Sequence, residues 1–232
     1  MTLSARYHTI LDEIARCCVS AGRDPEELRL VAVSKTVGLS TIEEAVSVGI
    51  CDFGENRPDS LGEKQRAFPQ ATWHFIGNVQ SRKIPEIVSC ASLIHSIYQP
   101  QHLAALDTAA QKAKKIQEIL VEVNVSGEQS KAGLAPEQVE DFIASAIEFE
   151  HIRVKGFMTM APQGDADRAR KCFDSLAELR SDMQQRFSGS MEDHGLHELS
   201  MGMSEDWRQA IEAGATIVRV GRAIFDDSFS KS

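Results

Sequence analysis

The sequence alternates between short apolar runs and longer segments with helical periodicity, and the pattern repeats about eight times. The segments between the runs carry apolar residues three and four positions apart, as amphipathic helices do. The strand-like runs are residues 30–33, 51–54, 72–77, 92–97, 119–125, 152–158, 197–200 and 216–221. The helical segments between them are residues 39–46, 61–67, 84–88, 102–115, 136–146, 166–187 and 204–213. This alternation predicts a single (β/α)8 TIM barrel, with an open doubly wound sheet as the alternative.

The composition fits one large core. With 232 residues, 42% of them hydrophobic, we expect residues 1–232 to form one domain. A net charge of −9 disfavours nucleic acid and anionic membranes as partners. Five cysteines without Cys-x-x-Cys spacing favour reduced thiols and a cytoplasmic location over disulfides or a zinc site. The N-terminal region predicts an amphipathic helix instead of a signal peptide, and no apolar run approaches membrane-spanning length.

A lysine follows the first predicted strand at the position where ligands bind in both candidate folds. Such folds bind ligands beyond the carboxyl ends of their strands. The apolar run from Leu30 to Val33 stops just before Lys35. Burial there would disfavour the charged ammonium form, and an uncharged amine is what Schiff-base formation with an aldehyde requires. The simpler interpretation is that Lys35 marks the point where the strand reaches water.

Two segments near the C-terminus resemble the halves of a phosphate site. Residues 200–204 place small and hydroxyl-bearing residues directly before a helix, and Gly221 follows the last strand. Backbone N–H groups at such positions favour anions, and barrels often build phosphate sites from their last two strand-to-helix loops. Simpler interpretations are that Ser204 caps the helix and that Gly221 only turns the chain.

A ligand that carries both an aldehyde and a phosphate would use both features, which suggests pyridoxal 5′-phosphate. Closing the barrel makes the Lys35 strand a neighbour of the last strand, which also carries Arg219. A guanidinium facing the pyridine nitrogen would donate a hydrogen bond and keep that nitrogen unprotonated. Such a ring is a weak electron sink, which disfavours carbanion chemistry. Arg219 could instead form a surface ion pair at the strand end.

Several segments, in order and over nearly the whole chain, resemble the pyridoxal phosphate homeostasis protein family. The family resembles the barrel domain of alanine racemase, a fold type III pyridoxal phosphate protein, and its members are regarded as cofactor carriers or regulators. The matching segments are Leu30-Val31-Ala32-Val33-Ser34-Lys35-Thr36, Phe53-Gly54-Glu55-Asn56-Arg57, Trp73-His74-Phe75-Ile76-Gly77, Gly156-Phe157-Met158-Thr159-Met160, Ser200-Met201-Gly202-Met203-Ser204 and Val218-Arg219-Val220-Gly221.

The resemblance implies a role for each matching residue. It makes Lys35 the Schiff-base lysine and Arg219 the partner of the pyridine nitrogen. The phosphate ligands and the remaining cofactor contacts that it implies are Ser200, the backbone amides of Gly221 and Arg222, and the side chains of Asn56 and Met203.

Two positions depart from the family pattern. Arg222 stands where a small residue is common, which could remove a hydroxyl contact to the phosphate or add a positive charge beside it. Asp226 stands where glycine is common, which leaves the geometry of the C-terminal tail open.

A racemase needs a second acid or base on the opposite face of the cofactor ring. In alanine racemase a tyrosine from a C-terminal β-domain supplies that group, and we expect no such domain in a chain that ends at Ser232. The tyrosines here are Tyr7 and Tyr98, of which only Tyr98 follows a strand. His74 and His95, taken singly, fit core histidines better than catalysts.

We therefore expect a pyridoxal phosphate carrier or regulator without catalytic turnover. It would be a monomer that serves pyridoxal phosphate-dependent apo-enzymes. The alternatives are a minimal amino-acid racemase and a barrel that binds another phosphorylated metabolite.

Overall fold

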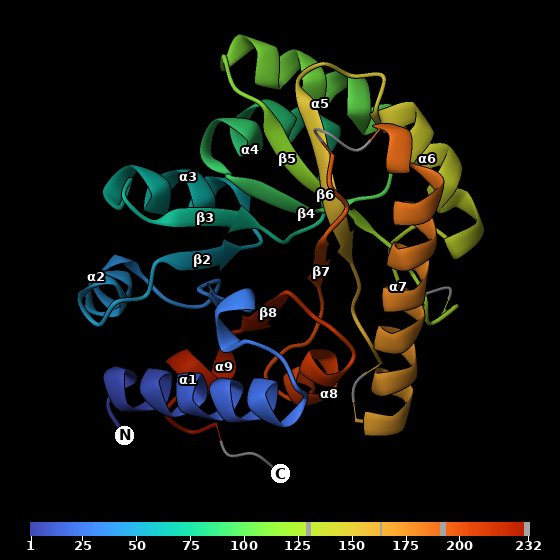
Figure 1. Cartoon of the computed structure of the whole chain (residues 1–232). Coiled ribbons are helices and arrows are strands. Elements are labelled where there is room, and N and C mark those ends of the chain that lie inside the picture. Colours follow the sequence, from blue (N-terminus) through green and yellow to red (C-terminus); the bar gives the residue numbers. More distant parts are fainter. Residues whose placement is uncertain (129–130, 163, 191–193, 230–232) are drawn as a thin grey trace.

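The computed structural model describes residues 1–128, 131–162, 164–190 and 194–229. Eight parallel strands form a closed barrel in sequence order, and β8 pairs with β1 to complete it (Figure 1). The predicted TIM barrel is therefore confirmed, and the open sheet is excluded. The strands are β1 Arg29–Val33, β2 Asp52–Glu55, β3 Thr72–Phe75, β4 Leu93–Ile97, β5 Gln117–Glu122, β6 Ile152–Met158, β7 Glu198–Ser200 and β8 Ile217–Val220.

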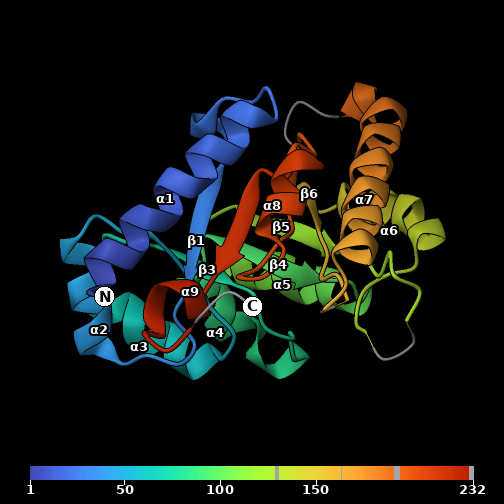
Figure 2. The same ribbon diagram turned by 90° about the horizontal axis from the view of Figure 1, so that it is seen from below.

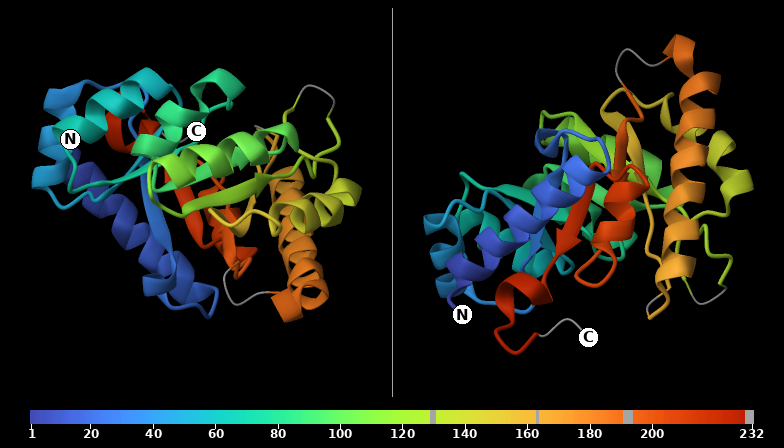
Figure 3. Two further views of the ribbon diagram at one scale, coloured as in Figure 1. Left: turned by 90° about the horizontal axis from the view of Figure 1, so that it is seen from above. Right: turned by 60° about the horizontal axis from the view of Figure 1, so that its bottom comes forward.

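Helices surround the strands on the outside, as two further views show (Figure 3). They are α1 Leu3–Ser20, α2 Leu39–Ser47, α3 Pro58–Ala67, α4 Ile84–Cys90, α5 Gln101–Lys112, α6 Val139–Ala146, α7 Ala166–Arg186, α8 Trp207–Glu212 and α9 Arg222–Phe225. Side-chain caps fix the start of the two longest helices: Thr2 accepts from the Ala5 N–H, and Asp165 accepts from the Arg168 N–H. No helix in this described part has the length and apolar character needed to cross a bilayer.

The first and last helices lie side by side beneath the barrel (Figure 2). Arg6 on α1 donates from Nε to the carbonyl oxygen of Ile224 on α9 at 2.7 Å. Residues from the two ends of the sequence therefore share one surface.

Alternation along each strand divides the interior into two environments. Side chains that point outward, such as Phe53, Trp73 and Phe75, pack under the helices in the large core cluster. A second apolar cluster, formed by Val31, Leu93, Leu120, Met158 and Ile217, is separate from it. Each member of this smaller cluster alternates along its strand with members of the large core, which places it inside the barrel. Polar side chains on the same strands, including His74, His95 and Arg219, are also buried.

Candidate functional site

A cavity of about 320 Å³ lies at the carboxyl ends of the strands. This volume is at the lower end of the range for small-molecule sites, roughly 300–1,000 Å³. Its walls come from the ends of several strands and from the segments that follow them. Six of the seven residues predicted to hold a cofactor line it, namely Lys35, Asn56, Met203, Arg219, Gly221 and Arg222.

Lys35 lies two residues beyond the end of β1, in a turn at the mouth of the barrel. Its side chain is exposed, so the prediction that burial desolvates this amine was wrong. The cause is the strand boundary: β1 ends at Val33, and the chain has left the packed interior when it reaches Lys35. Because Lys35 also lines the cavity, a ligand can approach this residue directly from solvent.

A buried ion pair fixes the backbone next to Lys35. Lys64 on α3 donates from Nζ to the carbonyl oxygen of Ser34 at 2.8 Å and to the carboxylate of Glu55. The Ser34 hydroxyl donates to the same carboxylate at 3.2 Å, and the other carboxylate oxygen accepts from the Asn56 N–H at 3.1 Å. One buried pair therefore positions the segments that carry both Lys35 and Asn56.

Two glycines allow the cavity walls to come close together. A Cβ on Gly77 would lie 2.1 Å from the backbone oxygen of Asn56, so any side chain there would force the backbone to move. Gly202 has a φ of +90°, and a Cβ on it would lie 2.6 Å from the Cβ of Ala210. This left-handed turn after β7 is what brings Met203 back to the cavity.

Arg219 is buried beneath the cavity and held by two hydrogen bonds. Its Nη1 donates to the Ser200 hydroxyl at 2.6 Å, and its Nη2 donates to the carbonyl oxygen of Thr159 at 3.0 Å. Burial lowers its pKa to about 10, while the negative charges of Asp206 and Glu122 act in the opposite direction. At that pKa the guanidinium stays protonated at neutral pH, so it presents only hydrogen-bond donors to the cavity.

Two carboxyl groups near Arg219 were missed by the sequence analysis. Burial raises the pKa of Glu122 to about 7, and Arg219 opposes that shift. Burial also raises the pKa of Asp206, which lines the cavity and accepts a hydrogen bond from the Met203 N–H at 2.6 Å. The sequence does not indicate Glu122 as a strand-end residue, because the strand-like run continues to Val125, whereas β5 ends at Glu122.

Ser200 is the predicted site residue that the structure does not bring to the cavity. It ends β7 with its side chain turned into the barrel, where its hydroxyl contacts Arg219 and lies 2.8 Å from Nδ1 of His95. Ser204, four residues later, lines the cavity together with Gly221. The predicted loop is therefore in place, but the hydroxyl that it offers is that of Ser204.

The two departures from the family pattern have local explanations. The Arg222 guanidinium forms an ion pair with Glu205 and lies over the Phe229 ring, 5.1 Å from its centroid. Its charge is therefore partly offset at the rim. Asp226 has an ordinary φ of −105° and accepts from the Ser228 N–H and hydroxyl at 2.9 and 2.6 Å. Glycine is not needed at that position.

Neither tyrosine lines the cavity. The Tyr98 hydroxyl donates to Oδ1 of Asn78 at 3.4 Å, and Tyr7 lies at the opposite end of the barrel.

Comparison with known proteins gives a consistent result. Residues 20–228 match the alanine racemase N-terminal domain model. The chain is 34% identical to the pyridoxal phosphate homeostasis protein of Aquifex aeolicus (strain VF5), over 98% of this chain and 99% of that protein.

Two solved structures extend the comparison. PipY of Synechococcus elongatus PCC7942, with pyridoxal phosphate bound, is 28% identical, with a TM-score of 0.84 over 97% of this chain and all of PipY. Alanine racemase of Clostridium difficile 630 shares the fold, with 12% identity and a TM-score of 0.71 over 95% of this chain and 60% of the racemase. The match to the domain model and the identity to the Aquifex protein over nearly the full length show that the chain belongs to the pyridoxal phosphate homeostasis protein family.

Proposed function

We propose that this protein binds pyridoxal 5′-phosphate at the mouth of the barrel, with Lys35 as the residue of covalent attachment, and acts in the homeostasis of that cofactor. The observation that supports this most directly is the convergence of Lys35, Arg219 and Ser204 on one cavity. The names of the relatives and the cofactor bound to PipY support the same function.

The residues present fit three of the polar groups of the cofactor. When bound, the cofactor supplies an aldehyde carbon that reacts with a lysine amine. The Arg219 guanidinium supplies a donor for the pyridine nitrogen. Ser204 and the backbone N–H groups of Gly221 and Arg222 supply donors for the phosphate, and no acceptor among the described residues is found for the Arg222 N–H. Asn56 and Met203 supply the remaining walls.

The surroundings of Arg219 favour holding the cofactor over catalysis. A donor that stays protonated leaves the pyridine nitrogen without a proton, so electrons are not readily withdrawn into the ring. Glu122 and Asp206 act on Arg219, and Asp206 also accepts from the Met203 backbone, so both have structural roles. Our proposal includes a carrier or regulatory role toward pyridoxal phosphate-dependent apo-enzymes, a monomeric state and a cytoplasmic location.

Borohydride reduction followed by peptide mass spectrometry tests the attachment site. The purified protein is given one equivalent of pyridoxal phosphate, reduced and digested. We expect the adduct on Lys35, and its loss in Lys35→Ala. Lys155→Ala is the control, because Lys155 is a partly exposed lysine away from the cavity that pairs with Glu118 at 3.8 Å. An adduct spread over surface lysines contradicts the proposal, and so does the absence of any adduct. If no adduct forms but the protein still binds the phosphate group of the ligand, a site for another phosphorylated metabolite is favoured.

A minimal racemase is the second candidate, because Asp206 offers a carboxyl group with a raised pKa at the cavity wall. The test is deuterium incorporation at Cα of L- and D-alanine and serine in D₂O with the loaded protein. We expect no sustained exchange. Exchange that is lost in both Lys35→Ala and Asp206→Asn would establish the racemase instead.

A further inference from the structure

A chain of hydrogen bonds crosses the inside of the barrel and ends at Arg219. Oδ1 of Asp52 lies 3.0 Å from Nε2 of His74, and Nδ1 of His74 lies 3.0 Å from Nε2 of His95. Nδ1 of His95 lies 2.8 Å from the Ser200 hydroxyl, which accepts from Nη1 of Arg219 at 2.6 Å. These residues come from five strands, so this chain of hydrogen bonds forms only when the barrel is closed.

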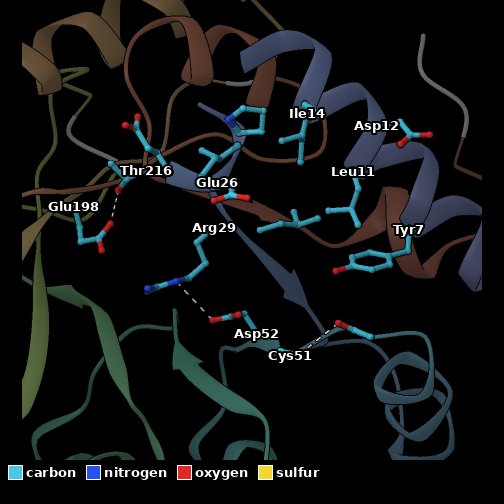
Figure 4. Close-up of a pocket in the computed structure, with 16 residues that line it drawn as sticks. Tyr7, Leu11, Asp12, Ile14, Glu26, Arg29, Cys51, Asp52, Glu198 and Thr216 are labelled. Carbon is cyan, nitrogen blue, oxygen red and sulfur yellow. Dashed lines mark hydrogen bonds and ion pairs between the residues drawn. The ribbon is translucent and has the colours of Figure 1, made fainter. Parts of the chain in front are cut away.

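The two ends of this relay, defined as Asp52, His74, His95 and Ser200, lie in different surroundings. Asp52 lies at a hollow of about 630 Å³ between α1 and the amino ends of the strands, and its side chain is 25% exposed (Figure 4). His74, His95 and Ser200 are completely buried. The relay therefore connects the amino end of the barrel to the residue that faces the cavity at the carboxyl end.

Elementary chemistry fixes the direction of the hydrogen bonds. A guanidinium can only donate, so the Ser200 oxygen must accept from Arg219. The Ser200 hydroxyl then donates its proton in a hydrogen bond to Nδ1 of His95. Nε2–H of His95 in turn donates to Nδ1 of His74. Nε2–H of His74 finally donates to the Asp52 carboxylate. In this arrangement every donor in the relay meets an acceptor.

The opposite direction leaves a group unsatisfied. If His95 donated to Ser200, the Ser200 oxygen would accept twice, and its own proton would have no acceptor within the relay. A buried hydroxyl without a partner costs free energy. Burial holds the pKa of His95 well below its ordinary value, so this ring is neutral. A neutral imidazole can both donate and accept, as the relay requires.

We propose that Ser200, His95 and His74 are positioning residues that hold the Arg219 guanidinium toward the cavity, with the direction of the relay set at its two ends by the Arg219 guanidinium and the Asp52 carboxylate. This inference deepens the proposed function, because Arg219 is the residue that would contact the pyridine nitrogen. It assigns a role to two histidines that the site itself does not use. It also means that a group at the amino end of the barrel influences a cavity at the other end.

The first experiment needs no cofactor. Long-range ¹H–¹⁵N correlation spectra of the ¹⁵N-histidine protein report which ring nitrogen carries the proton. We expect His74 and His95 to be neutral and protonated on Nε2. In Asp52→Asn the amide offers His74 either an acceptor or a donor, so we expect a mixture of tautomers at both histidines. A wild-type His95 that is protonated on Nδ1, or doubly protonated, overturns the proposed direction.

The second experiment separates positioning from simple packing. The ¹⁵N resonance of the ring nitrogen of bound [¹⁵N]pyridoxal phosphate and its dissociation constant are measured for Asp52→Asn and His95→Gln. We expect a shifted resonance and binding about 5-fold to 10-fold weaker in both variants, the effect of one disturbed hydrogen bond. His102→Gln is the matched control, since His102 is also buried, lies 3.1 Å from the Ser81 hydroxyl and is outside the relay.

An unchanged ring resonance and affinity in Asp52→Asn would overturn the positioning role, even if His95→Gln failed to fold. Failure of the proposed function looks different. In that case the wild-type protein would show no covalent adduct on Lys35, while the histidine tautomers of the unloaded protein would still test the relay.

Discussion

The two ends of the barrel each carry a hollow with charged walls, and the smaller one is the better candidate for the site. The amino-end hollow measures about 630 Å³ and the carboxyl-end cavity about 320 Å³. At the amino end Arg29 is 46% exposed and lies 3.8 Å from Asp52, which is a weak, solvated ion pair (Figure 4). At the carboxyl end Arg219 is buried and held by two hydrogen bonds.

The difference shows what distinguishes a site from a surface depression. Volume alone favours the amino end. Buried side chains with fixed partners favour the carboxyl end, where Lys64 and Glu55 hold the backbone beside Lys35. A group in a fixed orientation loses little entropy when a ligand binds, whereas an exposed ion pair must first be ordered.

Removing the arginine at each end should give the largest contrast. Arg219→Met removes a buried cation that acts on Glu122 and Asp206 and leaves the Ser200 hydroxyl and the Thr159 carbonyl oxygen without their donor, and we expect it to lower the free energy of unfolding by about 3–5 kcal/mol. Arg29→Met removes one exposed partner and should cost less than about 1 kcal/mol. Urea unfolding of both variants checks the comparison, and equal losses would contradict it.

The buried Lys64–Glu55 pair should have the next largest effect. Lys64→Met leaves the Glu55 carboxylate without a counter-charge, and we expect a loss of about 3 kcal/mol in unfolding free energy. Because Lys64 also binds the Ser34 carbonyl, covalent attachment of pyridoxal phosphate at Lys35 should slow as well. Lys83→Met, which breaks the exposed pair with Asp59, is the control. A stable Lys64→Met protein with the wild-type labelling rate would refute this role.

Glu122 should make stability depend on pH. Its pKa is about 7 in the folded protein and 4.5 in the reference state, so the folded protein binds more protons between these values. Stability from this residue is therefore greatest below about pH 4.5, falls as the pH rises to 7, and is about 3 kcal/mol lower above that. Glu122→Gln should remove this part of the pH dependence. Identical pH profiles of unfolding for the two proteins would contradict the prediction.

The smallest effect concerns the cavity wall. Gly77→Ala places a Cβ against the backbone oxygen of Asn56, and we expect a loss of about 1–3 kcal/mol together with weaker cofactor binding. Gly38→Ala is the matched control, because nothing lies within 4 Å of a Cβ there. Thermal unfolding and a binding titration of both variants provide the measurement. Wild-type behaviour of Gly77→Ala would show that the wall can move.

The sequence predicted the barrel and the meeting of its first and last strands, because both follow from periodicity and topology. Three features of the site needed coordinates. The exposure of Lys35 depends on where β1 ends. The position of Ser204, and not Ser200, at the cavity wall depends on the side-chain direction at the end of β7 and on the turn at Gly202.

The relay is the third such feature. The sequence shows His74 and His95 on separate strands, and each taken alone fits a core residue. Their contact depends on the register between β3 and β4. Their burial could be expected from an apolar context, but their partners could not. The extent of the single domain stays a prediction.

The contact between α1 and α9 has a consequence for biosynthesis. Arg6 bonds to the carbonyl oxygen of Ile224, and β8 must be present before β1 has both of its neighbours. A ribosome therefore releases the segment from Ile217 to Phe225 after every other wall of the cavity has been translated. Until then the nascent polypeptide lacks part of the cavity wall, so the site is complete only once β8 and the residues after it have been translated.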